Sequence, residues 1–447
     1  MKFLRPSLLA VAMAAAFPAM AQSNADLLKE LQSLKGRIAD LEQKLAEKPT
    51  QPQWGMTPEQ SAEFNRIAVK TEAMQDNFTD QGYKGLKVSG YMEPVFIWNK
   101  GQNRAGVQFL NQQADGFSYD TSFMGTAAID FTKETESGTI WKLTLAPNRG
   151  VGAAIDGKSI VQEATVSIPL GDLQTRLIAG QIPDWSGYEY QQPTLNPFTS
   201  HNLLYDFTLP IGYTGVGMDI KDGKWWLRSA VGNVNSTIKA SGQKSPMLAY
   251  RVDYAKGEFN GFGFAGMHGK AANFNLDGGV TTAHLFEVDG YFTRGDWTFQ
   301  GQLSYGQQKQ ASITPDADGN LRDARWVGVS GLMGYMFTPR LQGLVRADYI
   351  NNAKNGGGLF GYTGVQDVDA GVYADTRNGI GATAEDPDRG ANRYALTVGL
   401  KYAFDTSTTM KVELRYDGAD RAVFEDVKSG TLKKNNQMLA TSLVVAF

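Results

Sequence analysis

The feature that most constrains the fold is an alternation of apolar and polar residues that begins at Leu86 and runs to the C-terminus. Side chains of a strand point alternately to its two faces, so a period of two predicts strands with one apolar and one polar face. Sixteen such segments follow one another, and short turns alternate strictly with long loops between them. A sheet built in this way has all its turns at one end and all its long loops at the other.

The two faces of these strands differ clearly in character. In the predicted strand 391–404, Tyr394 and Leu396 share one face, whereas Arg393, Thr397 and Lys401 share the other. A soluble sandwich alternates in the same way. Two features favour a transmembrane barrel instead: the polar face carries many charges, as a water-filled lumen requires, and aromatic residues recur beside the short turns, as at a membrane interface.

The last predicted strand, 437–447, ends at Phe447. A strand at a chain end exposes an unpaired edge unless another strand closes on it, so we predict that the first strand, 86–98, pairs with the last. The predicted fold class is all-β: a transmembrane, antiparallel, up-and-down β-barrel of about sixteen strands over residues 86–447, preceded by a short α-helical coiled coil. A long loop at 99–116 is expected before the second strand, 117–133.

Residues 1–21 have the three parts of a secretory signal peptide. Lys2 and Arg5 form the positive region, and an apolar stretch covers Leu8–Phe17. The tripeptide Ala19-Met20-Ala21 then fits a cleavage site. An uncleaved anchor is the alternative, but the apolar run is too short to span a bilayer. Export and a barrel together predict the cell outer membrane as the location, with the N-terminal helices in the periplasm.

Residues 22–48 carry the heptad pattern of a coiled coil. Apolar residues recur at spacings of 4, 3, 4, 3 and 4, namely Leu27, Leu31, Leu34, Ile38, Leu41 and Leu45. This seam predicts an oligomer, and a helix lying on its own chain is the alternative. Residues 49–85 are predicted to form a linker and a second helix, which begins with the capping box Thr57-Pro58-Glu59-Gln60. That helix either extends the coiled coil or packs on the periplasmic rim of the barrel.

Together these features resemble the trimeric general and substrate-selective porins of proteobacterial outer membranes. The segment GLKVSGYMEPVFIWN at Gly85–Asn99 and the NGGG at Asn355–Gly358 are also similar to an uncharacterised family of porin-like proteins. The resemblance covers the whole chain at the level of architecture, and no motif fixes a substrate. It implies a homotrimer surrounded by outer-membrane lipid and lipopolysaccharide, and a terminal Phe447 that the barrel-assembly machinery reads. It also implies that the third external loop, 182–213, folds into the barrel and narrows it.

A barrel of about sixteen strands encloses an aqueous channel, so the predicted function is passive diffusion of small hydrophilic solutes or ions. Charges at the narrowest point set the selectivity of such a channel. The predicted constriction residues are Asp184, Glu189, Arg176, Arg251, Arg346, Arg393 and Arg415, and the acids predicted on the same lumen faces are Glu163, Asp253, Glu287, Asp289, Asp348 and Glu413.

These acids and bases nearly balance, so the sequence predicts no strong ion preference. Asp184 and Glu189 are expected to face the lumen arginines across a narrow gap, where charge acts strongly on passing ions. Loop 351–390 is the other candidate for the constriction.

Other classes of function receive less support. The chain has three histidines, and Ser200 beside His201 does not by itself make a nucleophile and its base, so no enzyme is predicted. The absence of cysteine excludes disulfides and thiolate metal sites. Acidic residues crowd loop 351–390, but solvated charge is favoured over a cation site there, and no metal or cofactor is predicted. A net charge of −3 gives no indication of a nucleic-acid partner. A non-conducting barrel that serves as an adhesin or structural protein is the serious alternative.

Overall fold

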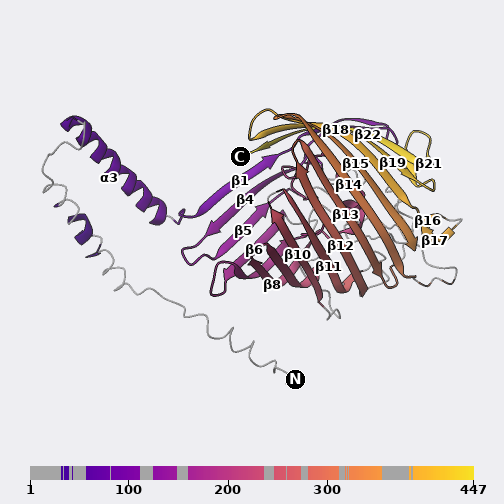
Figure 1. Ribbon diagram of the computed structural model, residues 1–447, viewed down its shortest axis with the longest axis horizontal. Coiled ribbons are helices and arrows are strands. Elements are labelled where there is room, and N and C mark those ends of the chain that lie inside the picture. Colours follow the sequence, from indigo (N-terminus) through magenta and orange to yellow (C-terminus); the bar gives the residue numbers. More distant parts are fainter. Residues whose placement is uncertain are drawn as a thin grey trace, which may run out of the picture. The chain divides into compact units, whose positions relative to one another are not determined.

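The computed structural model describes residues 32–33, 35–39, 43, 57–80, 82–110, 124–147, 160–235, 246–257, 259–272, 280–311, 318, 320, 322–354, 382–383 and 386–447. The chain divides into two compact units, Met1–Tyr83 and Lys84–Phe447 (Figure 1). The predicted signal peptide, 1–21, lies outside the described residues. Within the predicted coiled coil, 22–48, the few residues that are described are helical.

The first unit contains one long helix, α3 (Pro58–Asp80). Its first turn has the reciprocal hydrogen bonds of a capping box: the Thr57 backbone N–H donates to Gln60 Oε1 at 3.0 Å, and the Gln60 N–H donates to Thr57 Oγ1 at 3.2 Å. Pro58 follows the cap, where its missing N–H is not needed. No helix within the described part of the chain is both long and apolar enough to cross a membrane.

The second unit is one antiparallel sheet that closes on itself (Figure 1). Strand β1 (Leu86–Met92) pairs with the last strand, β22 (Asn435–Ala446), with Tyr91 opposite Ala446 and Met92 opposite Val445. Between them lie β2 (Val95–Asn99), β3 (Arg104–Gln108), β4 (Ala127–Glu134), β5 (Ile140–Leu145), β6 (Val161–Pro169), β7 (Thr175–Pro183), β8 (Gly212–Asp222), β9 (Trp225–Val234), β10 (Met247–Gly257), β11 (Asn260–Ala272), β12 (Val280–Arg294), β13 (Trp297–Gln308), β14 (Ala324–Thr338), β15 (Leu341–Lys354), β18 (Arg393–Ala403) and β19 (Thr408–Ala419). The predicted closure of the first strand on the last is confirmed.

The sheet has eighteen strands but forms a barrel of sixteen. Strands β1 and β2 continue one another, and both pair with β22. They are separated at Glu93-Pro94, where proline has no N–H for the ladder. Strands β3 and β4 likewise lie along β2 and β1, with residues 109–126 inserted between them. Two small hairpins, β16 (Ala382–Thr383) with β17 (Asp386–Gly390) and β20 (Phe424–Asp426) with β21 (Thr431–Lys433), stand outside this sheet.

The predicted first connection was wrong. In place of a long loop at 99–116, a tight turn joins β2 to β3, with Asn99 opposite Arg104. Asn103 adopts a positive φ of 49°, a conformation that asparagine tolerates better than most residues, and its N–H donates to the Lys100 carbonyl. Strand β3 was missed because its five residues, RAGVQ, contain little apolar alternation. The insertion follows β3 instead of preceding it.

The apolar face of the barrel points outward and the polar face inward. In β14, Val327, Val329 and Met333 are 40–47% exposed, whereas Ser330 between them is 1% exposed. In β18, Tyr394 and Leu396 are exposed while Arg393 and Thr397 are fully buried, as the sequence predicted. A soluble protein shows the reverse arrangement, so this outer surface suits the hydrocarbon of a membrane.

Aromatic side chains contact one another on the outer face near the short turns. Trp225 lies 4.7 Å from Tyr254 between ring centroids, and Trp297 lies 4.7 Å from Tyr335. Next to the turn before β19, Tyr402 and Phe404 meet edge to face at 5.0 Å. These pairs recur along the turn end of the sheet, as the aromatic girdle of a membrane barrel does.

Candidate functional site

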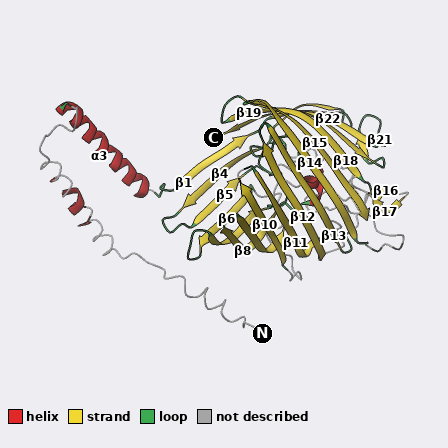
Figure 2. Cartoon of the chain, in the orientation of Figure 1, coloured by secondary structure: helices red, strands yellow, loops and turns green. Residues whose placement is uncertain are grey.

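The connection between β7 and β8, residues 184–211, is the candidate site and is called loop 3 below. Its two ends meet where the Asp184 N–H donates to the Ile211 carbonyl at 3.0 Å. It contains a short helix, α4 (Leu203–Thr208), which Asn202 caps by accepting from the Tyr205 N–H at 2.8 Å (Figure 2). Leu203, Leu204 and Phe207 are fully buried, and α4 packs on β13, β14 and β15. Loop 3 therefore lies against the inward face of the barrel wall.

The wall and the loop are matched in shape at two glycines. Gly328 of β14 lies under α4, and a Cβ there would come within 2.9 Å of the Leu204 side chain. Gly187 of loop 3 has a φ of +77°, which glycine adopts without strain, and a Cβ would meet Gln302 and Leu209 at 3.0 Å. The Gly187 N–H donates to Glu287 of β12 at 2.9 Å. Small residues at these positions thus let the loop backbone approach the wall.

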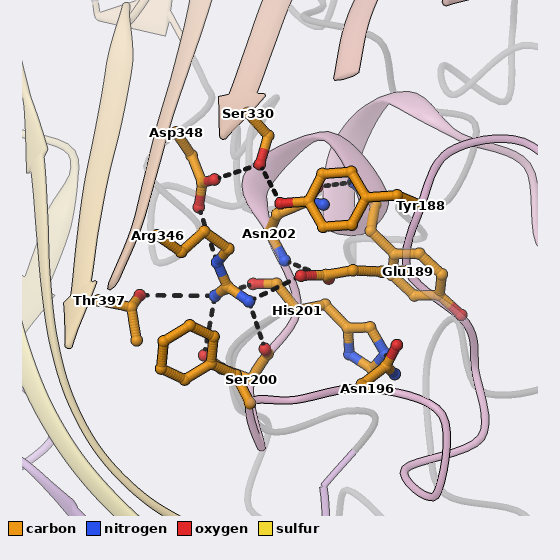
Figure 3. Close-up of polar contacts among 12 residues, drawn as sticks. Tyr188, Glu189, Asn196, Ser200, His201, Asn202, Ser330, Arg346, Asp348 and Thr397 are labelled. Carbon is orange, nitrogen blue, oxygen red and sulfur yellow. Dashed lines mark hydrogen bonds and ion pairs between the residues drawn. The ribbon is translucent and has the colours of Figure 1, made fainter. Parts of the chain in front are cut away.

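Arg346 of β15 is the centre of the contact between wall and loop (Figure 3). Its guanidinium donates to Glu189 Oε1 at 2.8 Å and to the carbonyls of Ser200 and His201 at 2.7 and 2.8 Å. On the wall side it pairs with Asp348 at 3.3 Å. Arg346 is fully buried, so these acceptors replace the water that the charge has lost.

Two further contacts extend this network. Glu189 also accepts from the Asn202 backbone N–H at 2.7 Å, which joins two parts of the loop. The Tyr188 hydroxyl lies 2.6 Å from Ser330 Oγ, and Ser330 in turn donates to Asp348 at 2.6 Å (Figure 3). The loop segment 188–202 is therefore bound through both its side chains and its backbone.

Strand β19 holds the same loop through three inward-facing side chains. Glu413 accepts from the backbone N–H groups of Thr199 at 2.7 Å and Ser200 at 3.1 Å. Lys411 donates to the Pro193 carbonyl at 2.7 Å, and Arg415 donates to the His201 carbonyl at 2.8 Å. These contacts satisfy backbone groups that a buried loop would otherwise leave unpaired.

Burial changes the protonation of two loop residues. Burial lowers the pKa of His201 to about 3, so the imidazole stays neutral. The His201 ring stacks on the Tyr205 ring, with 4.1 Å between the ring centroids. Burial also raises the pKa of Asp184 to about 6, against hydrogen bonds from the Tyr213 hydroxyl and the Ser186 N–H that favour the charged form. Asp184 therefore changes charge near neutral pH.

The structure brings together most, but not all, of the predicted constriction residues. Glu189, Arg346 and Arg415 converge on the segment 200–202, and Arg251 donates to the Trp185 carbonyl at 2.9 Å. Arg393 is fully buried beside Phe207 of α4, where it pairs with Asp417 at 2.7 Å.

Arg176 lies apart from this group. It is at the turn end of β7 and donates to Ser167 Oγ at 2.7 Å and to the Gly138 carbonyl at 2.6 Å. The expected gap between Glu189 and a lumen arginine is also absent, because Glu189 touches Arg346 directly. Most of the alternative gate, loop 351–390, lies outside the described residues.

Several residues of the network were not predicted as part of the site. Lys411, Asp417 and Ser330 face inward by the alternation of their strands, so the sequence indicates their side of the sheet. Asp417 pairs with Arg393 and Arg415 of the wall, whereas loop 3 supplies partners to Lys411 and Ser330, which nothing in the sequence indicates. The backbone carbonyls of Pro193, Ser200 and His201 could not be predicted as acceptors, because a backbone group has no residue type that marks it in the sequence.

Loop 3 leaves a cavity of about 610 Å³ between itself and the opposite part of the wall. Strands β5 to β10, with single residues or short parts of β11, β12 and β13, form its other side. The ionisable residues in its lining, apart from tyrosines, are Lys142, Glu163, Asp184, Glu189, Asp219, Arg228, Arg251, Asp253 and Asp289. Charged side chains from loop 3 and from the barrel wall therefore border one shared cavity.

A closed sixteen-stranded barrel with an apolar outer face and a polar lumen defines the fold class of outer-membrane porins. Residues 57–249 and 261–447 match the family model described as "Protein of unknown function (DUF3138)". Because the match covers most of the sequence, the chain belongs to this family. No relative was found among curated proteins.

Solved structures with a similar fold are outer-membrane channels. The chain is similar to an anion-selective porin from Comamonas acidovorans (TM-score 0.53, 10% identity, 81% of this chain and 99% of that one). It is also similar to OmpF of Salmonella typhi in complex with daunomycin (TM-score 0.52, 13% identity, 81% and 97%). The outer membrane channel DcaP of Acinetobacter baumannii gives a TM-score of 0.51 at 11% identity over 81% and 97%. At these identities the similarity shows the fold alone.

Proposed function

We propose that this protein is a porin: a passive diffusion channel of the outer membrane for small hydrophilic solutes or ions, narrowed by loop 3. The observation that carries the proposal is the anchoring of loop 3 inside the barrel by Arg346 and Glu413, beside a cavity that charged side chains border. A loop held by buried charged hydrogen bonds keeps a fixed shape, and a fixed obstruction in a water-filled barrel reduces its cross-section. No moving part or energy source is required.

Asp184, Glu189 and Arg251 are the predicted constriction residues that we propose to line the narrow section. All three border the cavity. We assign a different role to Arg346, Arg393 and Arg415, which are fully buried and which we propose hold loop 3 in place. Arg176, at the turn end of β7, would line the periplasmic mouth.

The assembly that we propose is a homotrimer in contact with lipid and lipopolysaccharide. The heptad seam of residues 22–48 supports an oligomer, after removal of a signal peptide at 1–21, with the helices in the periplasm. A native mass in mild detergent three times that of one chain, reduced when 22–48 is deleted, is the expected result. A monomer with the seam intact would contradict this assembly.

Conductance across a planar lipid bilayer tests the function. We expect discrete current steps that scale with salt concentration and need no added ligand. A correctly folded barrel, judged by heat-modifiable mobility in gels, that never conducts would instead support an adhesin or structural role.

A further inference from the structure

Loop 3 covers four positive side chains of β15, β18 and β19, together with the wall acids Asp348, Glu413 and Asp417. Arg346, Arg393 and Arg415 have no exposed surface, and Lys411 is 2% exposed. Glu189, the loop carbonyls and α4 occupy the space into which these four cations would otherwise point. A passing ion is therefore separated from them by a layer of protein that carries compensating negative and partial negative charge.

The cavity beside loop 3 has an excess of acids in its lining. Six carboxylates line the cavity against three bases, Lys142, Arg228 and Arg251. Each base is already paired: Lys142 with Glu163 at 2.7 Å, Arg228 with Asp253 at 2.8 Å, and Arg251 with Asp289 at 2.6 Å. Three acids are left over.

The three remaining acids differ in how far they are neutralised. Glu189 is paired with Arg346 at 2.8 Å. Asp184 accepts hydrogen bonds only from neutral groups, those of Ser186 and Tyr213, and the charge of Arg251, which is already paired with Asp289, acts on it without a hydrogen bond between them. Asp219 accepts from Trp226 Nε1 at 2.6 Å, which is also neutral. Asp184 and Asp219 thus add negative potential to the passage.

We infer that loop 3 masks the positive charge of the wall and leaves an acidic passage, so that the channel prefers small cations to anions. This inference rests on the proposed porin function. A narrow, low-dielectric passage strengthens the effect of each uncompensated charge, and the mobile ions concentrated there have the opposite sign. The near balance of acids and bases in the sequence does not predict this preference, because it counts buried bases (Arg346, Arg393, Arg415) and buried acids (Asp348, Glu413) as if they faced the passage, and it leaves out Asp219.

The zero-current potential of the full-length protein in a KCl gradient tests the inference. We expect a K⁺ to Cl⁻ permeability ratio of at least about 3. A ratio at or below unity would overturn the inference and leave the porin function intact. A folded barrel without any current would overturn the function itself, so the two failures are distinguishable.

Two substitutions test the source of the preference. Asp219→Asn and Asp184→Asn should each lower the permeability ratio measurably. Asp222→Asn is the matched control, because it removes the same charge from the same strand as Asp219 at an exposed position next to the turn. Equal ratios for all three variants and the wild type would overturn the assignment to these acids.

Deletion of residues 186–200 tests whether loop 3 shields the positive wall residues from the passage. It removes Glu189 and uncovers Arg346, so the permeability ratio should fall further than in either single variant. A deletion that widens the channel but leaves the ratio unchanged would contradict masking by loop 3.

Discussion

At the scale of single residues, Arg346 illustrates why a charge can be buried in this barrel. A guanidinium without water is costly unless every donor finds an acceptor and the charge finds a counter-ion. Arg346 has counter-ions in Glu189 and Asp348, and its Nη atoms donate to Glu189 and to the carbonyls of Ser200 and His201, whereas its Nε has only the 3.3 Å ion-pair contact with Asp348. Because Arg346 is fixed in strand β15, the contacts form only when loop 3 folds against that part of the wall.

Replacing Arg346 with alanine should release loop 3 without unfolding the barrel. Removing one partner of a buried ion pair costs about 3–5 kcal/mol, since Glu189 would be left uncompensated. The strand ladders do not depend on this side chain. We expect faster proteolysis within residues 184–211 and noisier single-channel currents. Arg340→Ala, at an exposed turn, is the control. Equal protection of the loop in both variants would refute the anchoring role.

Asp184 should make selectivity depend on pH. Burial raises its pKa to about 6, so the carboxyl is charged above that pH and neutral below it. Lowering the pH from 7.5 to 5 should therefore reduce the K⁺ to Cl⁻ permeability ratio. Asp184→Asn should lose the part of this change that is centred near pH 6. An identical pH profile in wild type and variant would show that another group is responsible.

At the scale of elements, loop 3 should limit conductance. It occupies the lumen beside β13, β14 and β15, and its backbone is bound by β19. Deleting residues 186–200 should raise single-channel conductance, because the obstruction is removed while the sixteen strands remain. Deletion of residues 111–123, a similar length within the insertion between β3 and β4, offers a comparison. Unchanged conductance after deletion in loop 3 would point to loop 351–390 as the constriction.

The strands themselves were largely predictable, because alternation is a local property that determines which face each side chain joins. The same rule placed Arg346, Arg393 and Arg415 on the inner face. It could not show that loop 3 covers them, since that depends on contacts between residues more than a hundred positions apart, such as Glu189 with Arg346. Strand β3 was missed for the opposite reason. Its pairing with β2 is local, but its residues show little alternation of apolar and polar side chains.

At the scale of the whole molecule, Phe447 lies at the seam that closes the barrel. Its backbone N–H donates to the Gly90 carbonyl at 3.0 Å, and the Gly90 N–H donates to the Phe447 carbonyl at 3.1 Å. Phe447 is 63% exposed. The terminal residue therefore completes the first-to-last strand pairing and presents an accessible aromatic group.

Deleting Phe447 should impair assembly in the outer membrane while secretion to the periplasm continues. The deletion removes both seam hydrogen bonds and the group that we propose the barrel-assembly machinery reads. The yield of heat-modifiable barrel in outer-membrane fractions is the measurement. Phe404→Ala, which removes another exposed aromatic near the turns, should leave that yield nearly normal. A normal yield without Phe447 would exclude its role as an assembly signal.

The central claim is that the barrel encloses an open, fixed passage. Single-channel recording of the full-length protein in a planar bilayer tests it most directly, in parallel with the 186–200 deletion variant. The account predicts stable current steps for the wild type that are proportional to voltage, and larger steps for the variant. A folded, membrane-inserted wild-type barrel that passes no current would contradict it.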